Sequence, residues 1–314
     1  MSQTQHLSEL LGRLETEQFN PATREIDLAS PLEIAELMNA QDAEVAAAVG
    51  KQKHAIAQAI EQVAQSFKNG GRLIYAGSGT SGRLGILDAS ECPPTFGSPP
   101  EMVQGIIAGG QQAVFKAVEG AEDDLGQGAA DVSALSLGPN DTLCGLAASG
   151  RTPYVLGAMA EGKRRGAATI FVCCVKPGQL PKELKPDILI AAEVGPEVIA
   201  GSTRLKSGTA QKMVCNMITT GAMIRLGKVW HNVMVDLQLS NQKLHERARR
   251  ILVTYAGVSY DEAVALLQES HGHVKTALLM ALSGLSAQQA RRRLEASDGF
   301  IRKALTSTEK KSDE

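Results

Sequence analysis

Aromatic residues are scarce in this chain: Phe, Trp and Tyr together make up 4% of its 314 residues. A surface that stacks nucleic-acid bases needs several aromatic rings, so this composition argues against that class of protein. The formal net charge of −2 gives no general attraction to nucleic acid. The chain also lacks a run of about twenty apolar residues, the length that a membrane-spanning helix needs. We therefore expect no nucleic-acid partner, no membrane partner and a cytoplasmic location.

Cysteine and histidine are few and poorly placed for metal binding. The five cysteines form no C-x-x-C motif, and among six histidines only His271 and His273 form a close pair. Buried, reduced thiols are the simpler interpretation of scattered cysteines. The sequence therefore predicts no metal site.

Apolar runs alternate with helical segments through the middle of the chain. A helix is expected at Pro153–Arg165. Short β-type runs are expected at Arg72–Gly77, Met102–Ala108, Thr142–Ala147, Thr169–Val175 and Asp187–Ala191. This alternation predicts an α/β fold with a parallel sheet covered on both faces, a three-layer αβα sandwich. Ligands of such sheets bind beyond the carboxyl ends of the strands, where the strand order reverses.

Helical segments flank this α/β region. Ser30 and Pro31 predict the start of one helix, and a second is expected from Ala43 to Asn69 with Asp42 as its N-cap. Beyond about residue 240 the pattern indicates three short amphipathic helices. The expected organisation is an N-terminal helical segment over 1–50 that packs on the body or a partner, the α/β domain over 51–240, a helical bundle over 241–305 and a disordered tail over 306–314.

A hydroxyl-rich turn follows the first predicted strand. It reads S-G-T-S-G-R and contains Ser78, Gly79, Thr80, Ser81 and Arg83. Free backbone N–H groups, hydroxyls and a positive helix end suit a phosphate. The spacing matches neither the dinucleotide motif nor a Walker loop. The alternative interpretation is a tight connection between a strand and a helix.

Two later segments have similar chemistry. Ser149 and Thr152 lie in A-A-S-G-R-T-P-Y, directly after the predicted third strand. Ser202, Lys206 and Lys212 lie in A-G-S-T-R-L-K-S-G-T-A-Q-K, ahead of a long helical stretch. Both segments suit an anionic ligand, although the second could be a solvated loop with an N-cap.

Two acidic residues are candidates for acid–base chemistry. Glu91 lies in D-A-S-E-C-P-P-T, and Glu122 lies in E-G-A-E-D-D, where Asp123 and Asp124 are alternative bases. A phosphate held by the S-G-T-S-G-R turn would repel a nearby carboxylate, which is therefore expected to face another part of the ligand. A helix cap or a solvated acidic turn is the alternative role for each residue.

Several motifs together resemble those of the N-acetylmuramic acid 6-phosphate etherases, which have the sugar isomerase (SIS) fold and are related to glucokinase regulatory protein. The motifs are A-G-S-G-T-S-G-R-L-G, L-D-A-S-E-C-P-P-T-F-G, I-A-G-G, E-G-A-E-D-D, A-G-S-T-R-L-K-S-G-T-A-Q-K and N-V-M-V-D-L-Q. The resemblance spans nearly the full chain. The sequence departs from the family pattern at Lys176 and at Trp230–Asn232, where His231 could be a ligand contact or a surface residue.

The resemblance implies a cofactor-independent lyase that acts on a small-molecule sugar phosphate. Such an enzyme cleaves the D-lactyl ether of N-acetylmuramic acid 6-phosphate by β-elimination and then adds water, with Glu91 as proton donor and Glu122 as base. Pro93, Pro94 and Phe96 could give Glu91 a dry setting that keeps it protonated. The resemblance also implies a homodimer and a C-terminal bundle similar to a ubiquitin-associated domain.

Two other functions fit the same fold. A regulatory sugar-phosphate sensor would keep the hydroxyl-rich loops without needing Glu91. An aldose–ketose isomerase would need an acid–base pair but would release no lactate.

Overall fold

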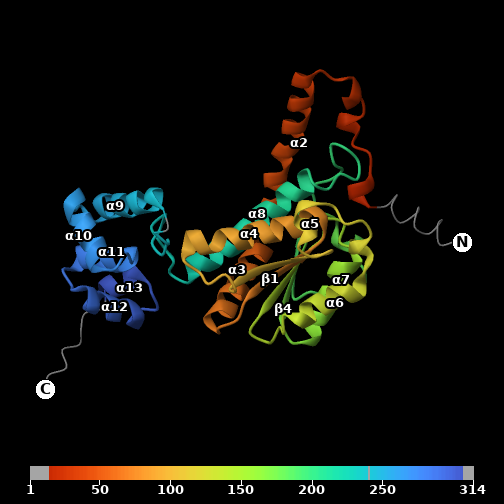
Figure 1. Cartoon of the computed structure of the whole chain (residues 1–314). Helices are drawn as coiled ribbons and strands as arrows, with labels where there is room; N and C mark the ends of the chain where they lie inside the picture. The colour runs from red at the N-terminus through yellow and green to blue at the C-terminus, as the bar shows by residue number, and fades with distance from the viewer. Residues whose placement is uncertain (1–13, 240, 307–314) are drawn as a thin grey trace, which may run out of the picture. The chain divides into compact units, whose positions relative to one another are not determined.

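The computed structural model describes residues 14–239 and 241–306 (Figure 1). The chain divides into two compact units, one formed by residues up to 90 with 100–219 and the other by 91–99 with residues from 220 onward. The predicted tail lies outside the described residues from position 307, and the predicted N-terminal segment is described from residue 14. All five cysteines fall in the described part, where they are buried and form no disulfide.

The first unit contains a five-stranded parallel sheet in the order β2-β1-β3-β4-β5. Its strands are β1 (Leu73–Gly77), β2 (Val103–Ile107), β3 (Thr142–Leu146), β4 (Ala168–Cys173) and β5 (Ile188–Ala191). These strands confirm the five predicted runs and the α/β class. Because β2 and β3 lie on opposite sides of β1, the strand order reverses at β1, and the loops after β1 and β3 border that point.

Helices cover both faces of the sheet, which confirms the αβα layering (Figure 1). A Cβ at Gly85 would lie 2.6 Å from the Tyr75 side chain, so α4 packs closely on one face of β1. A Cβ at Gly145 would meet Met159, so α7 packs on the opposite face. The helices of this unit are α2 (Pro31–Lys51), α3 (Lys53–Lys68), α4 (Gly79–Phe96), α5 (Gln112–Phe115), α6 (Leu125–Ala134), α7 (Pro153–Arg164) and α8 (Lys206–Arg225), the last turns of α4 and α8 belonging to the second unit.

The two N-terminal helices differ from the prediction at one boundary. Ser30 begins α2 with a capping box to Glu33, as predicted. Asp42, however, is not an N-cap, because α2 continues through it to Lys51. The segment around Asp42 contains neither Gly nor Pro and is rich in Ala and Glu, which favour helix continuation. The break comes instead at Gln52, and α3 then ends before Asn69, as predicted.

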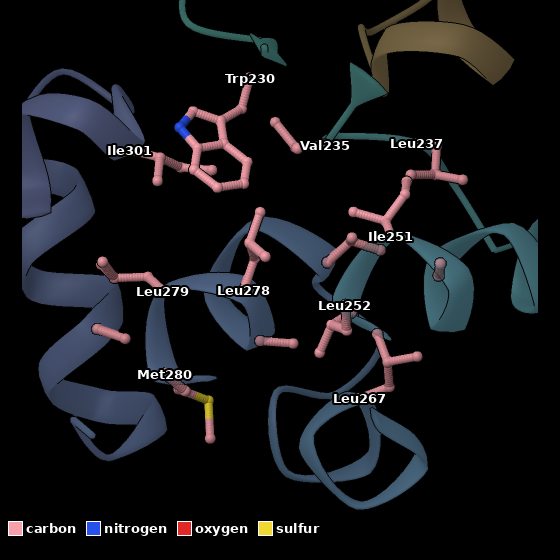
Figure 2. Packing of buried hydrophobic residues seen from close by; sticks show 14 of the residues in the cluster. Trp230, Val235, Leu237, Ile251, Leu252, Leu267, Leu278, Leu279, Met280 and Ile301 are labelled. Carbon is pink, nitrogen blue, oxygen red and sulfur yellow. The ribbon is translucent and has the colours of Figure 1, made fainter. Parts of the chain in front are cut away.

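The second unit is helical, and its described residues after 240 form five helices. They are α9 (Gln242–Ala256), α10 (Tyr260–Glu269), α11 (Val274–Ser283), α12 (Ala287–Ala296) and α13 (Ile301–Thr306), of which α10, α11 and α12 are the three predicted. A short hairpin of β6 (Val229–Trp230) and β7 (Val233–Met234) precedes them. Figure 2 shows Trp230 above Leu278 and beside Ile301 in the core of this unit. Along the described residues, no helix is long and apolar enough to span a membrane.

A partly buried ion pair joins the entrances of β1 and β3. Asp141 accepts from the Arg72 guanidinium at 2.8 Å, from the Arg72 backbone N–H at 2.8 Å and from the Gly138 N–H at 3.0 Å. Burial alone would raise the pKa of Asp141, but these hydrogen bonds and the Arg72 charge outweigh burial and lower it.

The lowered pKa of Asp141 predicts a pH-dependent contribution to stability. Its folded-state pKa lies below the unfolded value, so the stabilisation is complete above the unfolded pKa of about 3.9 and is lost as pH falls through the folded value. Asp141→Asn is expected to lower the free energy of unfolding by about 2 kcal/mol at pH 7 and by less near pH 3. Urea unfolding at both pH values measures this, and an equal loss at both would contradict it.

Candidate active site

The loop between β1 and α4 is shaped by close backbone contacts. A Cβ at Gly77 would lie 2.5 Å from the Gly82 nitrogen, so the strand end and the first helical turn fit together only with glycine there. Gly79 has φ +52°, a left-handed conformation that glycine adopts at no steric cost. The first intrahelical bond joins the Gly82 N–H to the Ser78 carbonyl at 3.2 Å. The N–H groups of Gly79, Thr80 and Ser81 therefore have no intrahelical acceptor and can serve an anion.

Glu122 lies beside this loop. It belongs to a short 3-10 helix at Ala121–Asp123, and its Oε2 accepts a hydrogen bond from the Ser78 hydroxyl at 3.2 Å. The Glu122 side chain is exposed. Asp124, one of the alternative bases, instead caps α6 by accepting from the Gln127 N–H at 2.8 Å. Glu122 of the acidic run thus contacts the hydroxyl-rich loop through Ser78.

The loop after β3 borders the same point of the sheet, since Leu146 pairs with Gly77 across the β1–β3 ladder. Ser149 is half-buried, and its hydroxyl accepts a hydrogen bond from the Arg151 N–H at 3.4 Å. Thr152 is the N-cap of α7 but makes no side-chain cap bond, so its hydroxyl is not committed to the helix. The two hydroxyl-rich loops predicted from the sequence therefore follow neighbouring strands.

Several predicted residues are engaged within the protein instead. The Ser81 hydroxyl is buried and donates to Gln211 Oε1 at 2.8 Å, and Arg83 Nε donates to the Val114 carbonyl at 2.9 Å. Lys206 is 1% exposed, and its ammonium donates to Gln41 Oε1 at 3.1 Å. In this conformation these groups join α4, α8 and α2 to their surroundings rather than lining an open site.

The N-terminus of α8 already binds a carboxyl group of the chain itself, which the sequence pattern does not indicate. Glu197, which is fully buried, accepts from the backbone N–H groups of Lys206 and Ser207 at 2.9 Å each. The anion-binding character predicted for this segment is therefore satisfied by the chain's own carboxylate. Ser202 lies just before this helix start and is half-buried, whereas Lys212 lies within α8 and is exposed.

Glu91 lies far along α4 from the β1 loop. Twelve residues of continuous helix separate it from Gly79, which corresponds to about 18 Å along the helix axis. Its side chain is exposed, so the predicted dry setting beside Pro93, Pro94 and Phe96 is not formed within one chain. The helix continues through both prolines instead of ending before them.

A buried carboxylate on α4 also escaped the sequence analysis. Asp88 is 8% exposed and lies one turn before Glu91. Its Oδ2 accepts from the Tyr75 hydroxyl at 2.9 Å, and its Oδ1 lies 3.2 Å from the Thr219 hydroxyl. Burial raises the pKa of Asp88, and the Tyr75 and Thr219 hydrogen bonds and the Lys212 charge partly offset this. The available signal was an acidic residue four positions after Leu84 and four before Cys92, on an otherwise apolar helix face.

The residues that depart from the family pattern contact other residues of the chain. Lys176 forms an ion pair with Glu15 at 2.6 Å. His231 has φ +51° and is exposed, its ring stacks on Tyr255 with centroids 5.5 Å apart, and Arg302 lies 3.2 Å from its Nδ1. Among the residues that the structure describes, no three His, Cys, Asp or Glu side chains are grouped to hold a metal ion.

Two parts of the chain match known protein-family models. Residues 55–163 match the family model described as the glucokinase regulatory protein N-terminal SIS domain, and residues 231–274 match the C-terminal lid domain of the same protein. A phosphoheptose isomerase from Francisella tularensis aligns with 61% of this chain and all of its own, at 19% identity and a TM-score of 0.46. Residues 55–163, which include β1 to β3 and both hydroxyl-rich loops, therefore form a SIS domain.

Similar proteins of known name show which family of SIS-domain proteins the chain belongs to. N-acetylmuramic acid 6-phosphate etherases from Salinibacter ruber and Serratia proteamaculans are 51% and 52% identical to this chain. The alignments cover 98% and 94% of this chain and 99% of each relative. A relative of the same name from Clostridium beijerinckii is 50% identical over 96% of this chain. The chain belongs to the N-acetylmuramic acid 6-phosphate etherase family.

Proposed function

We propose that this chain cleaves the D-lactyl ether of N-acetylmuramic acid 6-phosphate, releasing D-lactate and N-acetylglucosamine 6-phosphate. Relatives that share about half of their residues with this chain along nearly its whole length carry the etherase name. The observation in the structure that best supports the proposal is the contact between Ser78 and Glu122, which places a carboxylate at the edge of a phosphate-type loop. The enzyme would act in the cytoplasm, in the recycling of cell-wall amino sugars.

The reaction needs a base and an acid. Opening of the sugar ring leaves an aldehyde at C1, which acidifies the proton at C2. Glu122 takes this proton, the electron pair forms the C2–C3 double bond, and the C3–O bond breaks as Glu91 protonates the departing lactate oxygen. Water then adds at C3 and a proton returns to C2, so the two carboxyl groups exchange roles.

The phosphate belongs at the two hydroxyl-rich loops. The first-turn N–H groups of α4 and the hydroxyls of Ser78, Thr80, Ser149 and Thr152 are neutral donors of the kind that hold a monophosphate. Gly79 permits close approach of the backbone. A phosphate bound here repels the Glu122 carboxylate, which would turn from Ser78 toward the sugar carbons.

We propose that two copies of the chain complete each site. About 18 Å of α4 separates Glu91 from the loop that Glu122 contacts, which is longer than one hexose phosphate. Both carboxylates can therefore flank one sugar only if Glu91 comes from a second copy. Leu87 and Met217, which lie on α4 and α8, are 49% and 40% exposed, as expected for a face that a second copy covers.

A coupled D-lactate assay on 6-phosphorylated N-acetylmuramic acid tests the proposed activity. We expect steady release of D-lactate that depends on the enzyme, and little release from the unphosphorylated sugar, because the two loops then have no phosphate to bind. The glucokinase regulatory protein match favours a sensor as the second candidate, and a sensor would bind the sugar phosphate without releasing lactate. An isomerase would convert aldose to ketose, again without lactate. Lactate release no faster than in the absence of enzyme would contradict the proposal.

A further inference from the structure

The buried Asp88 carboxylate connects the core of the sheet to an exposed cation. Asp88 accepts hydrogen bonds from the hydroxyl groups of Tyr75 on β1 and Thr219 on α8. The side-chain amide of Asn216, oriented to satisfy both neighbours, donates to Asp88 Oδ1 at 3.1 Å and accepts from the Lys212 ammonium at 2.8 Å. The proposed reaction assigns no role to this network. It runs from β1 through α4 to the surface of α8.

The direction of the Lys212 side chain separates it from the phosphate loop. Its neighbour Gln211 bonds to Ser81 in the first turn of α4, so this part of α8 lies beside the loop. Lys212 itself reaches Asn216, which is four residues further along α8 and is bonded to Asp88. The ammonium is therefore held on the side of Asp88, between α4 and α8, and away from the N–H groups that would bind a phosphate.

The substrate carries a second anion that needs a cation of this kind. In the lactyl group a single carbon separates the ether oxygen from the carboxylate. The residue that protonates the ether oxygen and the cation that binds the carboxylate must therefore be close neighbours. Glu91 is one helical turn after Asp88 on α4, and Lys212 is fixed to the same Asp88 through Asn216.

We infer that Lys212 binds the lactyl carboxylate and that Asp88 is a positioning residue, which fixes the Lys212 ammonium through Asn216. This inference rests on the proposed ether cleavage. It identifies which of the two substrate anions this cation recognises, with Glu91 and Lys212 both supplied by the copy that does not supply Glu122. This network, anchored on the buried Asp88, orients the exposed ammonium before the substrate binds, so less conformational entropy is lost on binding.

The test compares two substrates that differ only at the lactyl carboxylate. One is the natural 6-phosphorylated acid and the other is its carboxamide. A hydrogen bond to a charged group corresponds to about tenfold to a hundredfold in binding, so the wild-type enzyme should prefer the acid by that factor in kcat/KM. In Lys212→Met this preference should fall close to one. Inhibition by N-acetylglucosamine 6-phosphate, which has the phosphate but no lactyl group, should change less than about threefold.

Three further variants test the positioning network. Asn216→Ala breaks the link to Asp88, and Asp88→Asn keeps its volume while removing its charge; both should lose most of the preference for the acid. The double variant Lys212→Met with Asn216→Ala should lose no more than Lys212→Met alone, because both changes remove the same interaction. Lys68→Met, which removes an exposed lysine from α3, is the matched control and should keep the wild-type preference.

The outcomes are distinguishable. If Lys212→Met keeps the acid preference, or loses affinity for N-acetylglucosamine 6-phosphate to the same extent, Lys212 does not bind the lactyl carboxylate. If Asn216→Ala keeps the preference, or if the two losses multiply in the double variant, the positioning role is wrong. If the wild-type enzyme releases no lactate from the acid, the proposed function itself fails. The preference is a ratio measured on folded enzyme, so a general loss of stability does not imitate it.

Discussion

Lactate release by a Glu122→Gln variant is expected to fall by about 10²- to 10⁴-fold in kcat, the usual contribution of a positioned general base. The amide cannot accept the C2 proton, so elimination has no base at the carbon that loses it. The variant should still bind N-acetylglucosamine 6-phosphate at least as tightly as the wild type. An uncharged side chain beside Ser78 no longer repels the phosphate.

Asp123→Asn is the control for this experiment, because it removes an adjacent carboxylate from the same 3-10 helix. We expect that variant to change kcat by less than about threefold, since the usual effect of an acid–base group is much larger. The assignment of the base is wrong if Glu122→Gln turns over normally while Asp123→Asn does not. Measuring affinity and kcat separately also distinguishes loss of the base from loss of the loop structure.

The sheet was predictable because its strands are short apolar runs, and its central strands β1 and β3 are buried on both faces. β1 and β3 are fully buried along their length, so their sequences show no polar alternation, which is the pattern of a parallel sheet covered by helices. The sequence predicts a helix start at Asp42 because an acidic residue can cap a helix, but the helix-forming residues around it carry α2 through this position. The break comes at Gln52, two residues after Gly50, a residue that disfavours the interior of a helix.

The hydroxyl-rich loops of the site were also predictable, since turn chemistry is local. The contacts of Lys206 and Glu197 could not be predicted in this way. Gln41 and Lys206 are 165 positions apart, and their hydrogen bond depends on how α2 meets the start of α8. A lysine that the sequence suggests as an anion ligand is thereby buried, and the helix start beside it is capped by Glu197. Only the fold determines which cations remain exposed.

The position of Glu91 shows a second limit of sequence reading. Its motif indicated a carboxylate near a phosphate loop because the two are close in sequence. A continuous helix turns this closeness in sequence into separation in space, at about 1.5 Å per residue. The prediction that the two carboxylates share one sugar therefore requires the second copy.

Mixing two inactive variants tests this arrangement most directly. Glu91→Gln and Glu122→Gln are each expected to be nearly inactive alone. If each site takes Glu122 from one copy and Glu91 from the other, mixed dimers contain one intact site, and random assembly restores about a quarter of the wild-type sites. Co-expressing the variants with different tags, isolating the mixed species and measuring D-lactate release gives the result. Recovery of half the wild-type activity per purified mixed dimer is the predicted outcome, and mixed dimers as inactive as either parent would contradict the shared site.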